Sequence, residues 1–245
     1  MISKNQIKLI TSLQLKKYRE TNKLFIAEGV KVIQELLQSN FTLEHLYETE
    51  LLFKKIPLEK KTIVTQSELK KISCLNTPNN CLALFKIPTN KILKETGLIV
   101  ALDTIRDPGN LGTIIRLCDW YGVENILCST ETVDVYNAKV IQATMGSIAR
   151  VTVHFIDLEH FLKTTSLPLF GTFMDGKNVY KEQLPQQGIL VLGNEANGIS
   201  KPLEKLITNK LAIPRFGNLQ VTESLNVATA AAIFLSEFKR STIER

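Results

Sequence analysis

The sequence predicts an α/β protein with two parts, a C-terminal domain built on a mainly parallel sheet and a smaller, basic N-terminal α/β domain. Three observations support this. From Gly97 onward, short apolar runs alternate with helical patterns. All the excess positive charge precedes residue 97. A stretch with Pro88 and two lysines, residues 87–96, has the composition of a linker. We expect one domain over residues 1–90, a linker over 91–97 and a second domain over 98–245.

The N-terminal part begins with a helical pattern. Between Ile7 and Gln38 the apolar residues recur at helical spacing, with a break predicted near Glu28 and Gly29. The polar positions of this segment include Lys16, Lys17, Arg19 and Lys23. Short apolar runs then follow, separated by polar turns, at residues 43–47, 62–64 and 81–86. They predict a compact α/β domain.

Charge is distributed unequally between the two parts. Residues 1–96 carry 16 Lys/Arg and 9 Asp/Glu, whereas residues 97–245 carry 14 and 15, within a net charge of +6. A basic domain beside a near-neutral one indicates a polyanion-binding domain attached to a domain with a different function. On charge alone, it is an equally good interpretation that the lysines merely keep a small domain soluble.

The C-terminal part contains six runs typical of buried strands, at residues 98–102, 125–128, 151–155, 169–173, 189–192 and 210–213. Helical patterns separate them, which predicts a mainly parallel sheet covered on both faces. Ligands bind such sheets beyond the carboxyl ends of the strands. Three Gly- and Asn-rich segments begin where strand-like runs end, so a functional site is predicted there.

Composition argues against several classes of protein. No apolar run approaches the ~20 residues of a membrane-spanning helix, and the first residues lack the apolar stretch of a signal peptide, so we expect a cytoplasmic protein. The four cysteines form no C-x-x-C pair and the three histidines complete no cluster, so we expect reduced thiols and no metal. Neither G-x-G-x-x-G nor G-x-x-x-x-G-K-[ST] occurs, which disfavours dinucleotides and nucleoside triphosphates.

The first motif, DPGNLGTIIR, covers residues 107–116. Pro108 and Gly109 predict a tight turn, and Asn110 is predicted to cap the helix that follows. The buried stripe of that helix is expected to consist of Leu111, Ile114, Ile115 and Cys118. Arg116 points away from this stripe, on a face with Thr113 and Trp120, where it can stack on the indole. A solvated arginine is the simpler alternative.

The second motif, GNEANGIS, covers residues 193–200. Its glycines and asparagines allow the backbone to approach a ligand closely, and Glu195 is its only carboxylate. A plain strand-to-helix connection with Ser200 as the cap is the simpler interpretation.

The third motif, ESLNVATAAAI, covers residues 223–233. Ser224 is predicted to begin and cap a helix that runs through Phe238 and is rich in alanine. Asn226 is harder to explain structurally, because an asparagine in the first turn of a helix lowers helix propensity unless its amide has a partner.

In this order and spacing the three segments are similar to the three motifs of the SpoU (TrmH-like) family of RNA ribose methyltransferases, in the SPOUT superfamily. The match spans residues 98–238. The pattern SLQLKKYRETNKLFIAEGVKVIQELL resembles the substrate-binding domain of many members, which itself resembles small ribosomal proteins. The resemblance therefore extends over both predicted domains.

This resemblance implies methyl transfer from S-adenosylmethionine to the 2′-hydroxyl of a ribose in RNA, and a catalytic sheet that ends in a deep trefoil knot. It implies a cofactor pocket near Leu192, Gly193, Ile213 and Leu225. Matching catalytic positions are Asn110, Arg116, Glu195, Ser224 and Asn226. An arginine, with a pKa above ~12, is a poor base. We therefore expect Arg116 to hold the target phosphate and stabilise the developing alkoxide.

The resemblance also implies a homodimer with the site completed across the interface, for which the Arg116, Trp120 and Tyr121 surface and the alanine-rich helix are candidates. The N-terminal domain favours large-subunit ribosomal RNA, held mainly through phosphates by Lys16, Lys17, Arg19 and Lys23. A transfer RNA ribose methyltransferase and a non-catalytic RNA-binding protein with a degenerate domain remain alternatives. A small-molecule α/β enzyme would leave the basic domain without a purpose.

Overall fold

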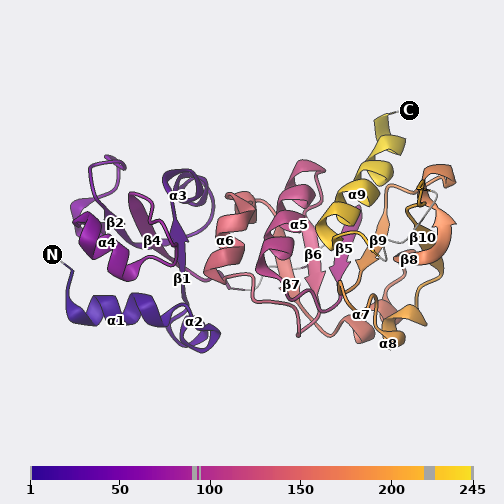
Figure 1. The fold of residues 1–245 in the computed structure, drawn as a ribbon, viewed down its shortest axis with the longest axis horizontal. Helices are drawn as coiled ribbons and strands as arrows, with labels where there is room; N and C mark the ends of the chain where they lie inside the picture. Colours follow the sequence, from indigo (N-terminus) through magenta and orange to yellow (C-terminus); the bar gives the residue numbers. More distant parts are fainter. Residues whose placement is uncertain (1, 90–92, 94, 218–223, 244–245) are drawn as a thin grey trace. The chain divides into compact units, whose positions relative to one another are not determined.

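The computed structural model describes residues 2–89, 93, 95–217 and 224–243 of the chain. They form two compact units, each with its own sheet. Unit 1 comprises residues 1–90 and 134–150, and unit 2 comprises residues 91–133 and 151–245. Both sheets and their helices can be followed in Figure 1.

Unit 1 is built on a four-stranded sheet in the order β1-β4-β2-β3. Its strands are β1 (Leu24–Glu28), β2 (Leu43–Glu48), β3 (Lys61–Ile63) and β4 (Cys81–Lys86). The helices before and between them are α1 (Lys4–Ser12), α2 (Lys16–Asn22), α3 (Val30–Leu37), η1 (Leu58–Lys60) and α4 (Gln66–Ile72). Strand β4 lies antiparallel between β1 and β2, whereas β2 and β3 are parallel.

Side chains alternate between the two faces of this sheet, as they must along a strand. Leu82 and Leu84 of β4 pack in one cluster with Ile10 of α1 and Leu69 of α4. On β1, Phe25 stacks with Phe85 of β4 at a centroid distance of 5.9 Å. Both faces are therefore apolar and covered.

Strand β1 corrects the prediction of a helical pattern from Ile7 to Gln38. The chain forms α1 and α2, then β1, and only then α3. Lys23 adopts a left-handed conformation, with φ 55°, and so ends α2. The run LFIAE that follows buries both of its faces, and periodicity cannot distinguish such a short apolar run from a helix.

A segment from the middle of the chain completes unit 1. It contains α6 (Ala138–Thr144) and η2 (Ser147–Ala149). Tyr136 packs on Phe25 with ring centroids 4.9 Å apart, and Arg150 forms an ion pair with Glu35 of α3. Residues 134–150 thus pack with the N-terminal unit, although they lie inside the range predicted for the second domain.

A buried arginine ties this segment to the first helices. Arg19 is 2% exposed, and its Nε and Nη2 donate to Asp134 Oδ2 at 2.8 and 2.6 Å. Its Nη1 donates to the carbonyl oxygens of Leu13 and Gln14. A buried guanidinium requires such full pairing, because the protein interior solvates charge poorly.

Unit 2 contains a six-stranded, all-parallel sheet in the order β10-β8-β9-β5-β6-β7. The strands are β5 (Leu98–Leu102), β6 (Asn125–Cys128), β7 (Thr152–Phe155), β8 (Leu169–Asn178), β9 (Gly188–Leu192) and β10 (Asn209–Ala212). The helices are α5 (Pro108–Trp120), α7 (Leu158–Thr164), η3 (Val179–Lys181), α8 (Lys201–Glu204) and α9 (Val227–Ile243). The predicted parallel α/β fold class is confirmed.

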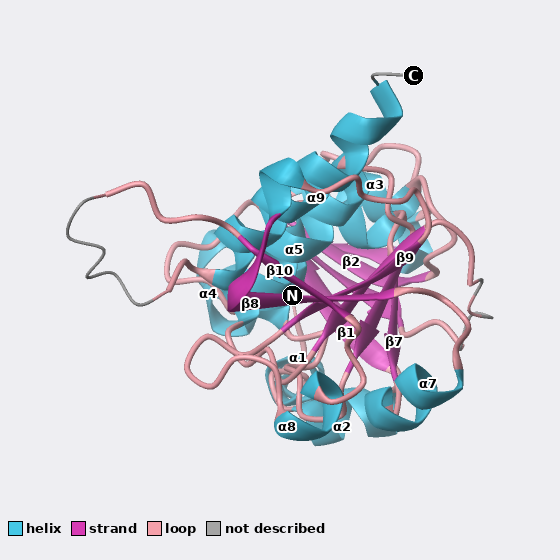
Figure 2. Cartoon of the chain, turned by 90° about the vertical axis from the view of Figure 1, so that its right-hand side faces the viewer, coloured by secondary structure: helices cyan, strands magenta, loops and turns pink. Residues whose placement is uncertain are grey.

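Helices cover both faces of this sheet, as Figure 2 shows. Helices α7 and α8 contribute Leu158, Leu162 and Leu203 to a cluster with alternate residues of β5 and β9. Helices α5 and α9 pack against each other on the opposite face, where Phe238 of α9 meets Phe170 of β8 edge to face at 5.3 Å. The carboxyl ends of the strands are left for loops.

The chain reverses its direction along the sheet twice near β8. After β9 it returns past β8 to form β10, and it then returns again to place α9 beside α5. Gly176 of β8 passes so close to β10 that a Cβ there would lie 2.5 Å from the Leu211 carbonyl carbon. The trefoil knot remains a prediction, since its loops include residues 218–223, outside the described residues. Three of the seven residues of the predicted linker, 91, 92 and 94, are outside them too.

Within the described part of the chain, no helix is long and apolar enough to cross a membrane.

We predict that Asp134→Asn lowers the free energy of unfolding by about 3 kcal/mol, because it leaves the buried Arg19 charge without its counter-charge. Urea unfolding followed by circular dichroism measures this. Glu44→Gln is the control, since Glu44 and Lys86 form an exposed pair at 3.4 Å whose loss costs less than about 1 kcal/mol. Equal losses in the two variants would contradict the structural role of the buried pair.

Candidate functional site

The pairing of β5 with β9 brings the first two motifs together. The strands are parallel and in register, with Leu102 opposite Leu192. The pairing continues one residue further, where the Asp103 amide donates to the Leu192 carbonyl at 2.9 Å. The loops that follow the two strands therefore leave the same edge of the sheet side by side.

The turn after β9 is closed by its own backbone. Asn194 and Gly198 exchange two hydrogen bonds, at 3.0 and 2.8 Å. Asn194 Oδ1 also accepts from the amides of Ala196 and Asn197. Only glycine fits at position 193, where a Cβ would lie 2.2 Å from backbone atoms of Gly198 and Ile199. Glu195 is thus carried, exposed, on a rigid turn.

Two residues that the motifs did not single out hold this turn against β5. Thr104 has φ 58°, an unusual conformation for a β-branched residue, and its carbonyl accepts from Asn194 Nδ2 at 2.8 Å. The buried Asp103 carboxylate accepts from the Ser200 amide at 2.7 Å. Asp103 at the end of a strand was a detectable signal, whereas the backbone conformation of Thr104 was not.

Asp107, rather than Asn110, caps helix α5. Its Oδ1 accepts from the Asn110 amide at 2.8 Å, and Pro108 occupies the first helical turn. The prediction of Asn110 as the cap is therefore wrong, because the carboxylate three residues earlier already fills that role. The predicted buried stripe is confirmed, since Leu111, Ile114, Ile115 and Cys118 are all buried. The Asn110 side chain is therefore available for hydrogen bonds outside helix α5.

Asn110 joins the three motifs through a chain of hydrogen bonds. Its Nδ2 donates to Glu195 Oε1 at 2.6 Å, and its Oδ1 accepts from Asn226 Nδ2 at 2.9 Å. Because an ionised carboxylate only accepts, Asn110 must turn its amide nitrogen to Glu195 and its oxygen to Asn226. The polarity of the chain is fixed by this requirement. We call Asn110, Glu195 and Asn226 the three-motif network.

Asn226 ends this network at the start of α9. Its Oδ1 accepts from the amides of Ala228 and Thr229 at 3.0 and 3.2 Å. The helix begins at Val227, so the prediction that Ser224 begins and caps it is wrong, and Asn226 caps it instead. The Asn226 side chain therefore has two kinds of hydrogen-bond partner, the backbone amides at the start of α9 and the Asn110 side chain. Ser224 is exposed.

Arg116 lies on the exposed face of α5 with Thr113 and Trp120, as predicted. Stacking of Arg116 on Trp120 is not found, since no ring contact joins the two among the described residues. Neither a hydrogen bond nor an ion pair holds its guanidinium within the same range. The cation is therefore available to a ligand, and the neighbouring Trp120 is 84% exposed.

The four predicted cofactor positions flank β9 and β10. Leu192 is buried, and its carbonyl is already used by Asp103. Gly193 and Ile213 follow the two strands and are half-buried, whereas Leu225 is 46% exposed just before α9. Phe216, in the loop after β10, is also exposed and contacts the Tyr180 ring. Apolar side chains are thus presented to solvent around these loops.

The predicted basic residues of unit 1 have different environments. Lys16, Lys17 and Lys23 are exposed, and Lys16 lies 3.8 Å from Glu20. Arg19 is buried with Asp134, so its prediction as an RNA contact is wrong. The basic segment therefore offers lysines alone.

The four cysteines lie where burial disfavours their reactive thiolate form. All four cysteines are free, and burial raises the pKa of the Cys74 and Cys81 thiols to about 12. Burial likewise raises the pKa of Cys118 and of Cys128. No group of three or more His, Cys, Asp or Glu suited to a metal ion occurs among the described residues.

Residues 97–236 match the SpoU rRNA Methylase family, and residues 4–83 match the MRM3-like substrate binding domain. The chain is 30% identical to the 23S rRNA (guanosine(2553)-2′-O)-methyltransferase RlmP of Bacillus subtilis, over 95% of this chain and 96% of that protein. It is 28% identical to the 23S rRNA (uridine(2479)-2′-O)-methyltransferase of Streptomyces viridochromogenes, over 68% and 62%.

Solved structures agree with these similarities. An RNA methyltransferase of the TrmH family from Porphyromonas gingivalis, described as putative, has a TM-score of 0.89 and 37% identity, covering 98% of this chain and 99% of that chain. An AdoMet-bound rRNA methyltransferase from Sinorhizobium meliloti has a TM-score of 0.86 and 26% identity, covering 98% and 97%. With three motifs joined at one edge of the sheet and a family match over more than half of its length, this chain belongs to the SpoU rRNA methylase family.

Proposed function

We propose that the protein transfers a methyl group from S-adenosylmethionine to the 2′-hydroxyl of a ribose in RNA. The observation that supports this best is the three-motif network, which gathers residues 85 and 116 positions apart at the carboxyl edge of the sheet. Relatives named for this reaction on 23S rRNA match the chain, one of them along nearly its whole length. The catalytic work belongs to residues 98–245 and RNA capture to residues 1–90.

The loops after β9 and β10 suit the proposed cofactor. S-adenosylmethionine supplies an electrophilic methyl group on a sulfonium. Its adenine requires apolar contact and backbone hydrogen bonds, which the exposed Leu225 and the half-buried Ile213 and Gly193 can provide. Gly198 has φ +67°, and among the described residues no neighbouring atom lies within 4 Å of its would-be Cβ, so a ligand can approach this turn closely.

The chain's own residues would align the nucleophile and stabilise charge. Arg116 is an unpaired cation on α5 among the described residues, suited to hold the phosphate beside the target ribose and to stabilise the developing alkoxide. Asn110 and Asn226 hold Glu195 in one orientation, while Ser224 is exposed next to the network. Alignment of oxygen and methyl group can contribute ~7–11 kcal/mol to catalysis.

Large-subunit ribosomal RNA is the proposed substrate, acted on in the cytoplasm. The N-terminal match to an MRM3-like substrate binding domain and the names of the 23S rRNA relatives support it. Transfer RNA is the second candidate. A non-catalytic RNA-binding role is disfavoured, because Asn110, Arg116, Glu195, Ser224 and Asn226 are all in place.

We further propose a homodimer that uses the exposed face of α5 and the alanine-rich α9. Trp120 is 84% exposed on that face, and a large aromatic side chain in water is typical of an interface. Arg116 lies on the same face, so a second copy could complete the site around it.

Arg116→Ala should lower the turnover of methyl transfer by about 100-fold or more, because an aligned cation would be lost from the transition state. Labelled methyl transfer to unmodified ribosomal and transfer RNA transcripts measures turnover, and calorimetry measures affinity for the methyl donor, which should stay unchanged. Lys163→Ala on α7, across the sheet, removes an equal charge and should keep full activity. Full turnover in Arg116→Ala would contradict the proposed role of Arg116 in holding the phosphate and stabilising the alkoxide.

Asn110→Ala and Glu195→Ala should not act independently, because each breaks the same network. We expect the double variant to lose activity by no more than the worse single variant, with a coupling energy of about 1–3 kcal/mol. Glu195→Ala combined with Lys163→Ala provides the additive control. Additive losses for Asn110 and Glu195 would show that the hydrogen bond between them does not matter for transfer.

Trp120→Glu should shift the protein from dimer to monomer in sedimentation, because it places a charge in the proposed apolar interface. Leu58→Glu, at a comparably exposed apolar residue of unit 1, should leave the dimer intact. A dimer that persists in Trp120→Glu would place the interface elsewhere, and a monomeric wild type that methylates RNA would remove it altogether.

A further inference from the structure

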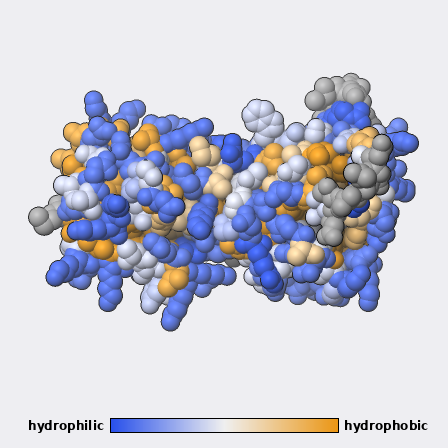
Figure 3. Space-filling view, in the orientation of Figure 1, coloured by the Kyte–Doolittle hydropathy of each residue, from blue (hydrophilic) through white to orange (hydrophobic). Residues whose placement is uncertain are grey.

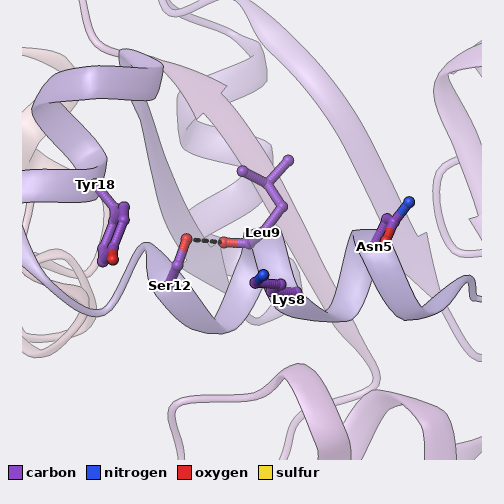
Figure 4. A pocket seen from close by; sticks show the side chains of 5 residues that line it. All are labelled: Asn5, Lys8, Leu9, Ser12 and Tyr18. Carbon is purple, nitrogen blue, oxygen red and sulfur yellow. Dashed lines mark hydrogen bonds between the residues drawn. The ribbon is translucent and has the colours of Figure 1, made fainter.

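Unit 1 has a pocket that the three-motif network does not involve. It is an open hollow of about 360 Å³ between α1 and α2, lined by Asn5, Lys8, Leu9, Ser12 and Tyr18 (Figure 4). The first four occupy successive turns of α1 on one face, at helical spacing. Tyr18 comes from the first turn of α2 and stands at the end of this stripe. We call it the Tyr18 pocket.

The lining combines an aromatic ring, an apolar side chain and a few polar groups. Tyr18 is 41% exposed, and Leu9 is half-buried. Ser12 Oγ donates to the Leu9 carbonyl at 2.7 Å, which leaves its lone pairs able to accept. The Asn5 amide and the Lys8 ammonium have no hydrogen-bond partner within the described residues. This composition, and a volume near the lower end of ~300–1,000 Å³, suits one small planar group.

The charge around the pocket selects an anionic ligand. Helix α1 carries Lys4 and Lys8 and no acidic residue. Helix α2 adds Lys16 and Lys17, opposed only by the exposed Glu20. Hydrophilic side chains protrude along both helices in Figure 3. Phosphate contacts with such lysines supply affinity without sequence preference.

A concave, partly apolar pocket among cations fits a nucleotide better than a lipid surface, which would leave the hollow unfilled. Single-stranded and looped RNA presents bases that are free to stack on exposed aromatic rings. The Asn5 amide can both donate to and accept from the edge of such a base, and the Ser12 hydroxyl oxygen can accept from it.

We propose that the Tyr18 pocket binds one unstacked base of single-stranded or looped RNA, with the base on the Tyr18 ring and the neighbouring phosphates at Lys4 and Lys8. The proposal rests on the RNA methyltransferase function and deepens it, by naming the feature of the substrate that unit 1 recognises. Binding would then depend on a base and not on phosphate charge alone.

The test uses the full chain and a fluorescently labelled single-stranded oligoadenylate, with affinity measured by anisotropy. Tyr18→Ala should weaken binding about tenfold, while Tyr18→Phe, which keeps the ring, should stay within about twofold of wild type. Lys8→Ala should weaken binding more than Lys55→Ala, a charge-matched change at an exposed lysine in the loop after β2. Circular dichroism confirms that each variant is folded.

An abasic strand with the same number of phosphates separates stacking from charge. It should bind wild type and Tyr18→Ala equally. The proposal is overturned if Tyr18→Ala binds oligoadenylate like wild type, if it loses the abasic strand to the same degree, or if wild type binds neither strand. Methyl transfer is measured separately. If the wild type methylates RNA but Tyr18→Ala binds and methylates RNA equally well, only the pocket proposal is rejected. If binding depends on Tyr18 but the wild type transfers no methyl group to any RNA, only the proposed enzymatic function is rejected.

Discussion

The in-register pairing of β5 with β9 is the constraint on which the site depends. It sets Asp103 beside the residue that follows Leu192, so that two loops nearly 90 residues apart in sequence emerge together. Everything built on that edge inherits its rigidity from a strand pair buried on both faces. Joining these loops requires an unfavourable left-handed backbone conformation at Thr104 and a closed turn at Asn194. Both occur at the edge of the sheet where a ligand would bind.

Helix α9 depends on the same edge through Asn226. One side chain satisfies the helix amides and binds Asn110, so the start of the helix and the orientation of Glu195 are set together. The packing of α9 on α5 and of Phe238 on Phe170 fixes where that helix start lies. Site geometry and core packing are thus two aspects of one arrangement, which explains why polar residues remain ordered at an exposed edge.

Unit 1 separates structural from available charge. Arg19 is consumed by Asp134 and two carbonyl groups, and Glu28 accepts from Ser73 and Cys74 beneath the sheet, where burial raises its pKa. The lysines of α1 and α2 instead face solvent around Tyr18. The number of positive charges in unit 1 is therefore larger than the number of phosphate contacts that its side chains can make. The Tyr18 ring offers a further contact, base stacking, which a count of charges does not include.

The sequence by itself determined the parallel α/β class, all six strands of unit 2, the buried stripe of α5 and the family, because apolar period and glycine-rich turns are local properties. It misplaced β1, since the apolar run of that strand is too short to show a period, and it assigned caps to Asn110 and Ser224 where Asp107 and Asn226 act. It also counted Arg19 as a surface cation. Only the tertiary structure decided the places of β1 and Arg19, because each depends on a partner far away in the chain, β4 and Asp134 respectively. The two caps are set by near neighbours, Asp107 for α5 and Asn226 for α9, whereas the bond from Asn110 to Glu195 spans 85 residues.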